Sequence, residues 1–109
     1  ARGATWIAQG RDWSCRASGG LDYRDRDGAV ALPAPSLIGA HQYLNAGLAV
    51  AMLRHQRKVP VSERALAKGL RRASWPARLQ RLSAGPLTAL VAQRTIWLDG
   101  GHNPDAGAR

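Results

Sequence analysis

The hydrophobic positions of the first 32 residues fall into short segments that are separated by glycine-containing turns. Apolar residues cluster at 6–8, 13–17, 21–24 and 29–32, with Gly10, Gly19-Gly20 and Asp27-Gly28 between them. An Asp-Gly pair suits a two-residue hairpin turn, because both central positions of a type I′ turn need a positive φ. The pattern therefore predicts a small antiparallel meander, followed by an extended connector at Pro33 and Pro35.

After Gly39 the hydrophobic period changes to that of a helix. Residues 41–55 are largely apolar, so we expect a helix that is buried on most of its sides. Pro60 interrupts it, and Ser62 is a suitable N-cap for a second helix. That helix should be amphipathic and pack on the first; its apolar stripe comprises Ala65, Leu66, Gly69, Leu70 and Ala73.

The last third of the chain has shorter patterns. Trp75-Pro76 ends the second helix, because proline disfavours helical geometry in the residue before it. Residues 78–82 alternate weakly, 86–93 are ambiguous between helix and loop, and 95–98 form the strongest strand pattern. This strand runs into a glycine turn and a helix start at 103–106, which is typical of an α/β domain. One strand and one helical turn could not bury a core by themselves.

Composition excludes several classes of protein. The 109 residues hold at most one modest domain, and 45% hydrophobic with 21% charged residues is typical of a folded chain. The single cysteine, Cys15, rules out an internal disulfide and a cysteine-based zinc site. The longest apolar stretch, 46–53, is too short to cross a bilayer, so we expect a cytoplasmic protein without membrane contact.

The net charge of +9, from 16 Lys and Arg against 7 Asp and Glu, raises nucleic acid as a partner. The arginines are dispersed, however, and only 54–72 is dense in them, mostly on one face of the second predicted helix. A solvated helix face explains that pattern better, so we expect no specific nucleic-acid binding. A small basic nucleic-acid-binding module is the alternative, and sequence preference that survives high salt would support it.

Three segments place polar residues in apolar surroundings. They are Gly39-Ala40-His41-Gln42-Tyr43-Leu44-Asn45-Ala46, Trp75-Pro76-Ala77-Arg78-Leu79-Gln80 and Leu98-Asp99-Gly100-Gly101-His102-Asn103-Pro104. In this order and spacing, the chain from about Leu32 to Arg109 resembles the folylpolyglutamate synthase and dihydrofolate synthase branch of the Mur ligase family. The segment before Leu32 resembles the family only loosely, and Ala77 stands where the family often has glycine.

The resemblance implies an α/β fold shared between two domains. Residues 1–74 would be the C-terminal portion of a Mur-ligase-type central ATPase domain, with small antiparallel strands and two helices. Residues 75–82 would be an interdomain linker, and 83–109 the first strand, turn and helix of a Rossmann-like C-terminal glutamate-ligase domain. The chain starts without a methionine and ends after a helix start, so we expect an internal fragment. We expect the intact protein to be a monomer.

The resemblance also implies an ATP-dependent ligase. Family members activate a carboxylate with ATP as an acyl phosphate, which the amino group of an amino acid attacks. Here it implies addition of L-glutamate to folate or dihydropteroate, with ATP and Mg²⁺ as cofactors; another Mur-type amide ligase is the alternative. The sequence has no Gly-Lys-Ser/Thr phosphate loop. That loop, the metal ligands and the folate pocket would lie N-terminal to this region, and the fragment alone should be inactive.

Four residues are candidates for the nucleotide site. The amide of Asn45 can pair with the adjacent donor and acceptor of an adenine edge, and the Arg78 guanidinium suits phosphate oxygens. Asp99 ends a strand, where a carboxylate can accept ribose hydroxyls, and His102 stands at a helix mouth that favours anions. The resemblance places all four at the nucleotide, and no catalytic residue or metal ligand is expected in this chain.

Each candidate also has a purely structural interpretation. Without the motifs, Asn45 would be a buried amide bonded to backbone, Asp99 a turn or capping residue, and His102 an exposed neutral side chain. His41 and Gln42 belong to the first motif, and we expect them to give structural support.

Overall fold

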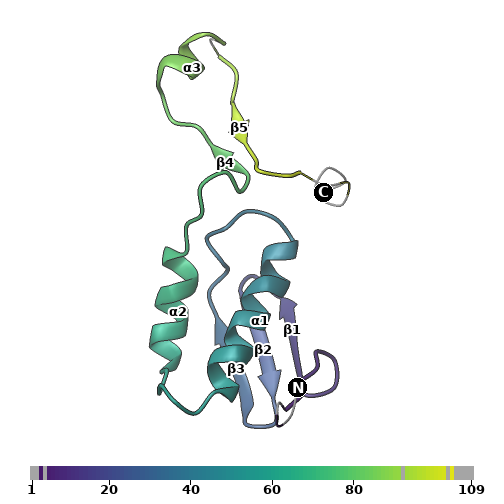
Figure 1. Ribbon diagram of the computed structural model, residues 1–109. Coiled ribbons are helices and arrows are strands. Elements are labelled where there is room, and N and C mark those ends of the chain that lie inside the picture. The colour runs from purple at the N-terminus through teal and green to yellow at the C-terminus, as the bar shows by residue number, and fades with distance from the viewer. Residues whose placement is uncertain (1–2, 4, 92, 103, 105–109) are drawn as a thin grey trace. The chain divides into compact units, whose positions relative to one another are not determined.

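The structure is a computed structural model that describes residues 3, 5–91, 93–102 and 104. The chain divides into two compact units, Ala1–Ala73 and Ser74–Arg109. The elements of the first unit are β1 (Trp13–Ala17), β2 (Leu21–Asp25), β3 (Gly28–Leu32), α1 (His41–His55) and α2 (Glu63–Arg72) (Figure 1). Those of the second unit are β4 (Gln80–Arg81), α3 (Pro86–Ala89) and β5 (Trp97–Leu98). Among the described residues, no helix has the length and apolar character that a membrane span requires.

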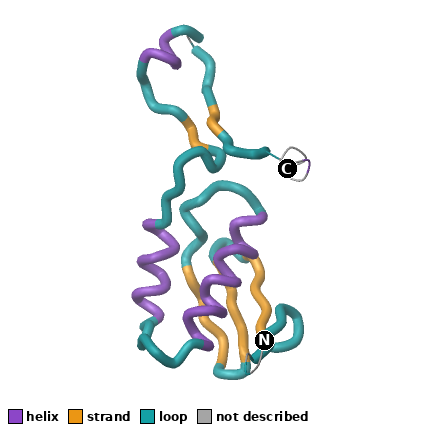
Figure 2. Tube along the Cα trace, in the orientation of Figure 1, coloured by secondary structure: helices purple, strands orange, loops and turns teal. Residues whose placement is uncertain are grey.

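The sheet of the first unit is an antiparallel meander in the order β1-β2-β3, which confirms the predicted arrangement (Figure 2). The turn between β2 and β3 lies one residue earlier than predicted, because Asp25 pairs with Gly28 and leaves Arg26 and Asp27 in the turn. The Asp25 carboxylate accepts the Asp27 N–H at 3.0 Å. This side-chain turn bond fixes the register, and the Asp-Gly pair alone did not reveal it.

The predicted strand at 6–8 is wrong. Residues 5–8 have no regular structure, and Gln9 forms only an isolated bridge with Trp13. The Ala8 N–H donates to the Asp12 carboxylate at 2.7 Å, and the Asp12 N–H donates to the Ala8 carbonyl at 2.9 Å. Asp12 therefore closes a local turn whose hydrogen bonds replace those of a strand.

Helix α1 has the predicted bounds and lies over one face of the sheet, against β1 and β2 (Figure 1). Gly47 allows the close approach, since a methyl group at that position would overlap the Cys15 sulfur. The expectation that α1 is buried on most sides is wrong, because no element of the first unit covers its outer face. Met52 is 67% exposed there, and Leu44 and Leu48 are exposed beside it. The buried core comprises Trp13, Leu21, Tyr23, Val30, Leu32, Ala46, Val50, Ala51 and Leu66.

Helix α2 begins after the predicted cap, with the Ala65 N–H donating to the Ser62 hydroxyl at 3.2 Å. Its contacts are mainly with β3, so the prediction that it packs on the first helix is wrong in its partner. Leu66 is the one buried residue of this helix, whereas Gly69 of the predicted stripe is exposed. The connector between β3 and α1 also contacts α2, because the Ser36 N–H donates to the Leu70 carbonyl at 3.0 Å. Periodicity along the sequence does not show this contact.

A buried ion pair joins α1 to β2. The Arg54 guanidinium donates two hydrogen bonds to the Asp25 carboxylate, at 2.7 and 3.0 Å. The Asp25 side chain is 0% exposed and that of Arg54 18%. Arg54 holds the pKa of Asp25 below its usual range, and burial raises the pKa of the Tyr23 phenol above its own. Because the guanidinium also lies 5.6 Å from the centre of the Tyr23 ring, it contacts both the ion pair and the core.

The second unit has little regular structure. β4 and β5 pair antiparallel through two residues each, so the strands predicted at 78–82 and 95–98 form only in part. A four-residue helix, α3, occupies the start of the ambiguous segment 86–93. Apart from Pro104, the helix start predicted at 103–106 lies outside the described residues. None of the described residues of this unit is buried.

Candidate functional site

Two of the three sequence motifs meet in the second unit. The turn at 76–79 leads into β4, and β5 leads into the loop at 99–102. The Gly100 N–H donates to the Ala77 carbonyl at 2.7 Å. The Asp99 carboxylate accepts the Leu79 N–H at 2.7 Å, across 20 positions of sequence. Arg78 therefore lies between two residues whose backbones are bonded to the Asp99-Gly100 segment.

The turn around Arg78 has an unusual backbone. Ala77 has φ 57° and Leu79 φ 45°, which is the left-handed region on both sides of the arginine. This region costs an alanine about 1 kcal/mol more than a glycine, since a Cβ atom crowds the carbonyl oxygen. The glycine common at this place in the resembling family thus matches the conformation that Ala77 adopts. The turn holds the exposed Arg78 side chain on a defined backbone, without an ion pair among the described residues.

Asp99 closes a turn, as its structural interpretation predicts. One carboxylate oxygen accepts the Leu79 N–H, and the other accepts the Gly101 N–H at 2.7 Å. Each carboxylate oxygen has two lone-pair directions and can accept more than one hydrogen bond. The predicted role at a ribose is compatible with this geometry, but the turn is the role that the contacts display.

His102 is exposed in the same loop. Its Nδ1 lies 3.2 Å from the Gly100 carbonyl oxygen. In the tautomer that carries hydrogen on Nδ1, this atom donates to the carbonyl and Nε2 remains accessible. Arg78, Asp99 and His102 thus occupy two loops that hydrogen bonds join within one unit.

Asn45 is on α1 in the first unit, and it is exposed instead of being the buried amide of its structural interpretation. Its Nδ2 donates to Gln42 Oε1 at 3.1 Å, and Gln42 Nε2 lies 3.1 Å from His41 Nε2. Gln42 is only 5% exposed, so a buried side chain orients the Asn45 amide. The meeting of Asn45 with the other three candidates on one nucleotide stays a prediction.

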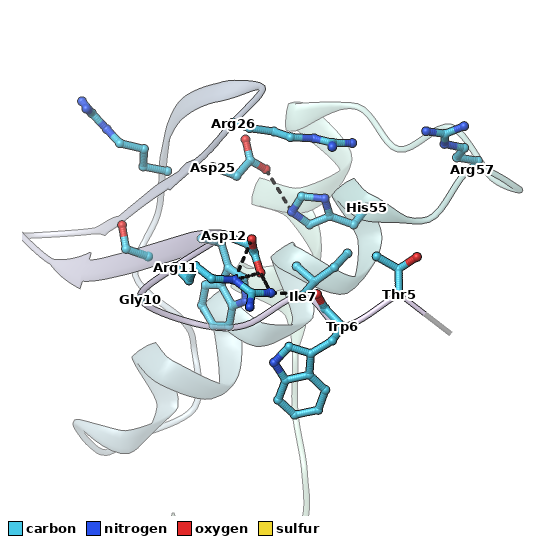
Figure 3. A pocket seen from close by; sticks show the side chains of 13 residues that line it. Thr5, Trp6, Ile7, Gly10, Arg11, Asp12, Asp25, Arg26, His55 and Arg57 are labelled. Atoms are coloured by element: carbon cyan, nitrogen blue, oxygen red, sulfur yellow. Dashed lines mark hydrogen bonds and ion pairs between the residues drawn. The ribbon is translucent and has the colours of Figure 1, made fainter. Parts of the chain in front are cut away.

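Sequence reasoning missed a cleft in the first unit, shown in Figure 3. Its lining residues come from the N-terminal segment, the end of β2 and the end of α1. They include several arginines that are far apart in the sequence and that the fold brings close together. The sequence signal that could have indicated this cleft is the Gly10-Arg11-Asp12-Trp13 segment. Its glycine and charged residues directly before a tryptophan are typical of a turn that is packed against a core. Among the described residues, no group of three or more His, Cys, Asp or Glu could hold a metal ion.

No family model matches the chain. The chain is 41% identical, over 73 residues, to the probable bifunctional folylpolyglutamate synthase/dihydropteroate synthase of Haloferax volcanii, covering 67% of this chain and 8% of that protein. The fold is similar to that of Escherichia coli FolC in complex with DHPP and ADP, with a TM-score of 0.73 and 30% identity, covering 95% of this chain and 22% of that one.

A second solved structure is a bifunctional folylpolyglutamate synthase/dihydrofolate synthase with Mn, AMPPNP and L-glutamate bound. Its TM-score is 0.68 at 28% identity, and the match covers 90% of this chain and 21% of that one. The chain thus spans less than a quarter of the length of each of these three relatives. Sequence and α/β fold together show that the chain belongs to the folylpolyglutamate synthase and dihydrofolate synthase family, of which it matches one segment.

Proposed function

We propose that this chain is part of an ATP-dependent ligase that adds L-glutamate to folate or dihydropteroate. The main observation behind this proposal is that hydrogen bonds join the loop of Arg78 to the loop of Asp99 and His102. An exposed guanidinium on a turn held by backbone bonds suits the recognition of phosphate oxygens. The solved relatives contain ADP with DHPP, and AMPPNP with Mn and L-glutamate, which supports a nucleotide and a folate-type acid as ligands.

The proposed reaction has two steps. A substrate carboxylate oxygen attacks the terminal phosphorus of ATP and ADP leaves, giving an acyl phosphate. The amino nitrogen of glutamate then attacks the acyl carbon, phosphate leaves, and the nitrogen loses a proton as the amide forms. Because both steps move negative charge on phosphate oxygens, a fixed guanidinium such as Arg78 would stabilise the transition states.

The other candidates would bind and orient the nucleotide. Asn45 would pair with the adenine edge through the amide atoms that Gln42 leaves unused. Asp99 would accept ribose hydroxyls in addition to closing its turn, and His102 would contact the nucleotide through Nε2. The described residues do not form a metal site, so we assign the Mg²⁺ ligands to other parts of the enzyme and no step to this chain's carboxylates.

The domain assignment is part of the proposal. We place 1–74 in the ATPase domain, 75–82 in the linker and 83–109 in the C-terminal domain of a longer ligase. The exposed apolar face of α1 and the lack of buried residues among the described part of the second unit support this, because both indicate surfaces that further protein would cover. An arginine in a linker could then contact phosphate only when the two domains close on it.

A segment exchange tests the proposal. In the hybrid enzyme, this chain replaces the aligned segment of the bifunctional synthase that was solved with AMPPNP and L-glutamate. The ligation activity of the hybrid is then measured as a function of ATP and glutamate. Arg78→Ala should raise the barrier by about 2–4 kcal/mol, or lower kcat/KM roughly 30- to 1000-fold, through loss of a charge-assisted contact.

Arg94→Ala is the matched control, because Arg94 is also an exposed arginine of the second unit but lies outside both joined loops. It should change kcat/KM less than about threefold. Unchanged turnover and nucleotide affinity in Arg78→Ala would contradict the assignment. The 109-residue chain by itself should neither hydrolyse ATP nor form glutamate conjugates, and ligation by it alone would overturn its place as one part of a larger enzyme.

A further inference from the structure

The cleft of the first unit has a volume of about 820 Å³, and its lining includes none of the candidate residues of the nucleotide site. Three segments line it: the N-terminal coil with the start of β1, the end of β2 with its turn, and the end of α1 (Figure 3). Trp6 and Ile7 supply apolar surface, and Trp6 is largely exposed. A concave surface with an apolar wall and gathered charged groups is the usual form of a ligand site.

The two acidic residues in the lining are each neutralised by an arginine. The Arg11 guanidinium donates to both oxygens of Asp12, at 2.7 to 3.2 Å. Asp25 receives two hydrogen bonds from Arg54 and is fully buried. Neither carboxylate therefore presents an uncompensated negative charge to the cleft.

Three further arginines line the cleft, and none of them shares these pairs. Arg24 and Arg57 have no ion pair among the described residues, and Arg26 has only a 3.7 Å contact with the exposed Asp27. Figure 3 shows Arg26 beside Asp25 and His55, with Arg57 on the same side. The cleft is therefore cationic after its internal pairs are counted.

His55 adds an unsatisfied donor or acceptor to this cationic wall. Its side chain is 8% exposed, and its Nε2 lacks a hydrogen-bond partner although it lies 3.7 Å from Asp25 Oδ2. Buried ring nitrogens in folded proteins are almost always hydrogen-bonded, so each exception calls for a partner. This nitrogen faces the Asp25 carboxylate within the fold and has no accessible surface, so His55 lies in the wall of the cleft and its ring reports on what binds there.

We propose that this cleft binds the oxyanion group of a ligand, a carboxylate or a phosphate. Arg26 and Arg57 hold the anion by charge, His55 lies in the wall beside them, and Trp6 and Ile7 cover the less polar part of the ligand. The binding uses only residues of the first unit, so it does not depend on the proposed ligase function.

The test is a titration of the full 109-residue chain followed by NMR at constant ionic strength. The two probes are inorganic phosphate and a peptide of three γ-linked glutamates, which separate the two sources of oxyanion. Saturable movement of the His55 ring signals is expected with at least one probe, while the His41 signals stay in place. Arg57→Gln should weaken binding about three- to tenfold, as expected for a partly exposed charge-assisted contact.

Arg64→Gln removes the same charge from the exposed side of α2, outside the cleft, and should leave the affinity within about twofold. Binding that only the cleft variant weakens supports the proposal, and the preferred probe identifies the source of the anion. Equal weakening by both variants, movement of only the His102 signals, or no saturation with either probe would overturn it. Such a result would not change the ligation expected of the synthase that carries this chain as its exchanged segment. The two proposals can therefore be disproved independently of each other.

Discussion

Different interactions stabilise each of the two units of this chain. Among the residues that the structure describes, the first unit buries nine hydrophobic side chains and an ion pair, whereas the second buries none. Apolar burial supplies most of the free energy of folding, so the first unit should unfold as one cooperative structure. The second unit is joined by exposed hydrogen bonds, those between β4 and β5 and those of the Ala77, Leu79 and Asp99 loops, and should open locally at low cost. The proposed closure of Arg78 on a nucleotide would suit the second kind of region.

The largest effect on this contrast should come from the ion pair of the first unit. Arg54→Met leaves the Asp25 carboxylate buried without its partner, and we expect the free energy of unfolding to fall by about 3 kcal/mol. Urea unfolding followed by circular dichroism measures the change. Hydrogen exchange at the Leu79 amide, in the second unit, should stay the same. The matched control is Arg26→Met, on an exposed neighbour, which should cost less than about 0.5 kcal/mol.

The same variant has a pH signature. The pKa of Asp25 is lowered on folding, so its contribution is present above the unfolded pKa and is lost as pH falls through the folded value. The stability of the wild-type chain should therefore decline below about pH 4, and Arg54→Met should flatten that decline. The exposed Arg11–Asp12 pair also lowers the pKa of its carboxyl and would leave a residual slope. An identical pH slope in both proteins would show that the ion pair is not its cause.

A pair of glycine substitutions separates core packing from helix propensity within the first unit. Gly47→Ala should destabilise by about 1–3 kcal/mol, because the methyl group would overlap the Cys15 sulfur. Gly69→Ala, in α2, has nothing within 4 Å of the added carbon and should stabilise by about 0.5–1 kcal/mol. Thermal unfolding of both variants measures the difference. Equal signs would mean that α1 does not approach β1 as closely as the structure has it.

Local signals in the sequence predicted the parts of the fold that depend on local interactions. The bounds of α1 follow from its hydrophobic period, and the start of α2 follows from the hydroxyl of Ser62. The errors lie where a distant or side-chain contact decides. Asp12 closes a turn in place of the strand at 6–8, and α2 packs on β3, a contact between distant segments that the hydrophobic period does not encode.

The candidate site shows the same division. The motifs singled out Arg78, Asp99 and His102 by residue type and order, and the structure brings their loops together. No local pattern indicated that Asp99 would bond the Leu79 backbone, because that contact spans 20 positions. It also could not show that the arginine lies between two left-handed residues. Backbone conformation of this kind is set by the closed turn and not by the propensity of alanine or leucine.

The smallest predicted effect concerns the second unit, which is the less stable of the two. Ala77→Gly removes about 1–2 kcal/mol of left-handed strain and costs about 0.5–1 kcal/mol of chain entropy, so the net gain for the turn should be on the order of 0.75 kcal/mol. Exchange of the Leu79 and Gly100 amides should slow about two- to fivefold, while the melting temperature of the first unit stays constant. Ala73→Gly, at φ −59°, relieves no strain and should leave these amides unchanged. Faster exchange in Ala77→Gly would mean that the turn is not strained, and that the second unit owes its low stability to its missing core alone.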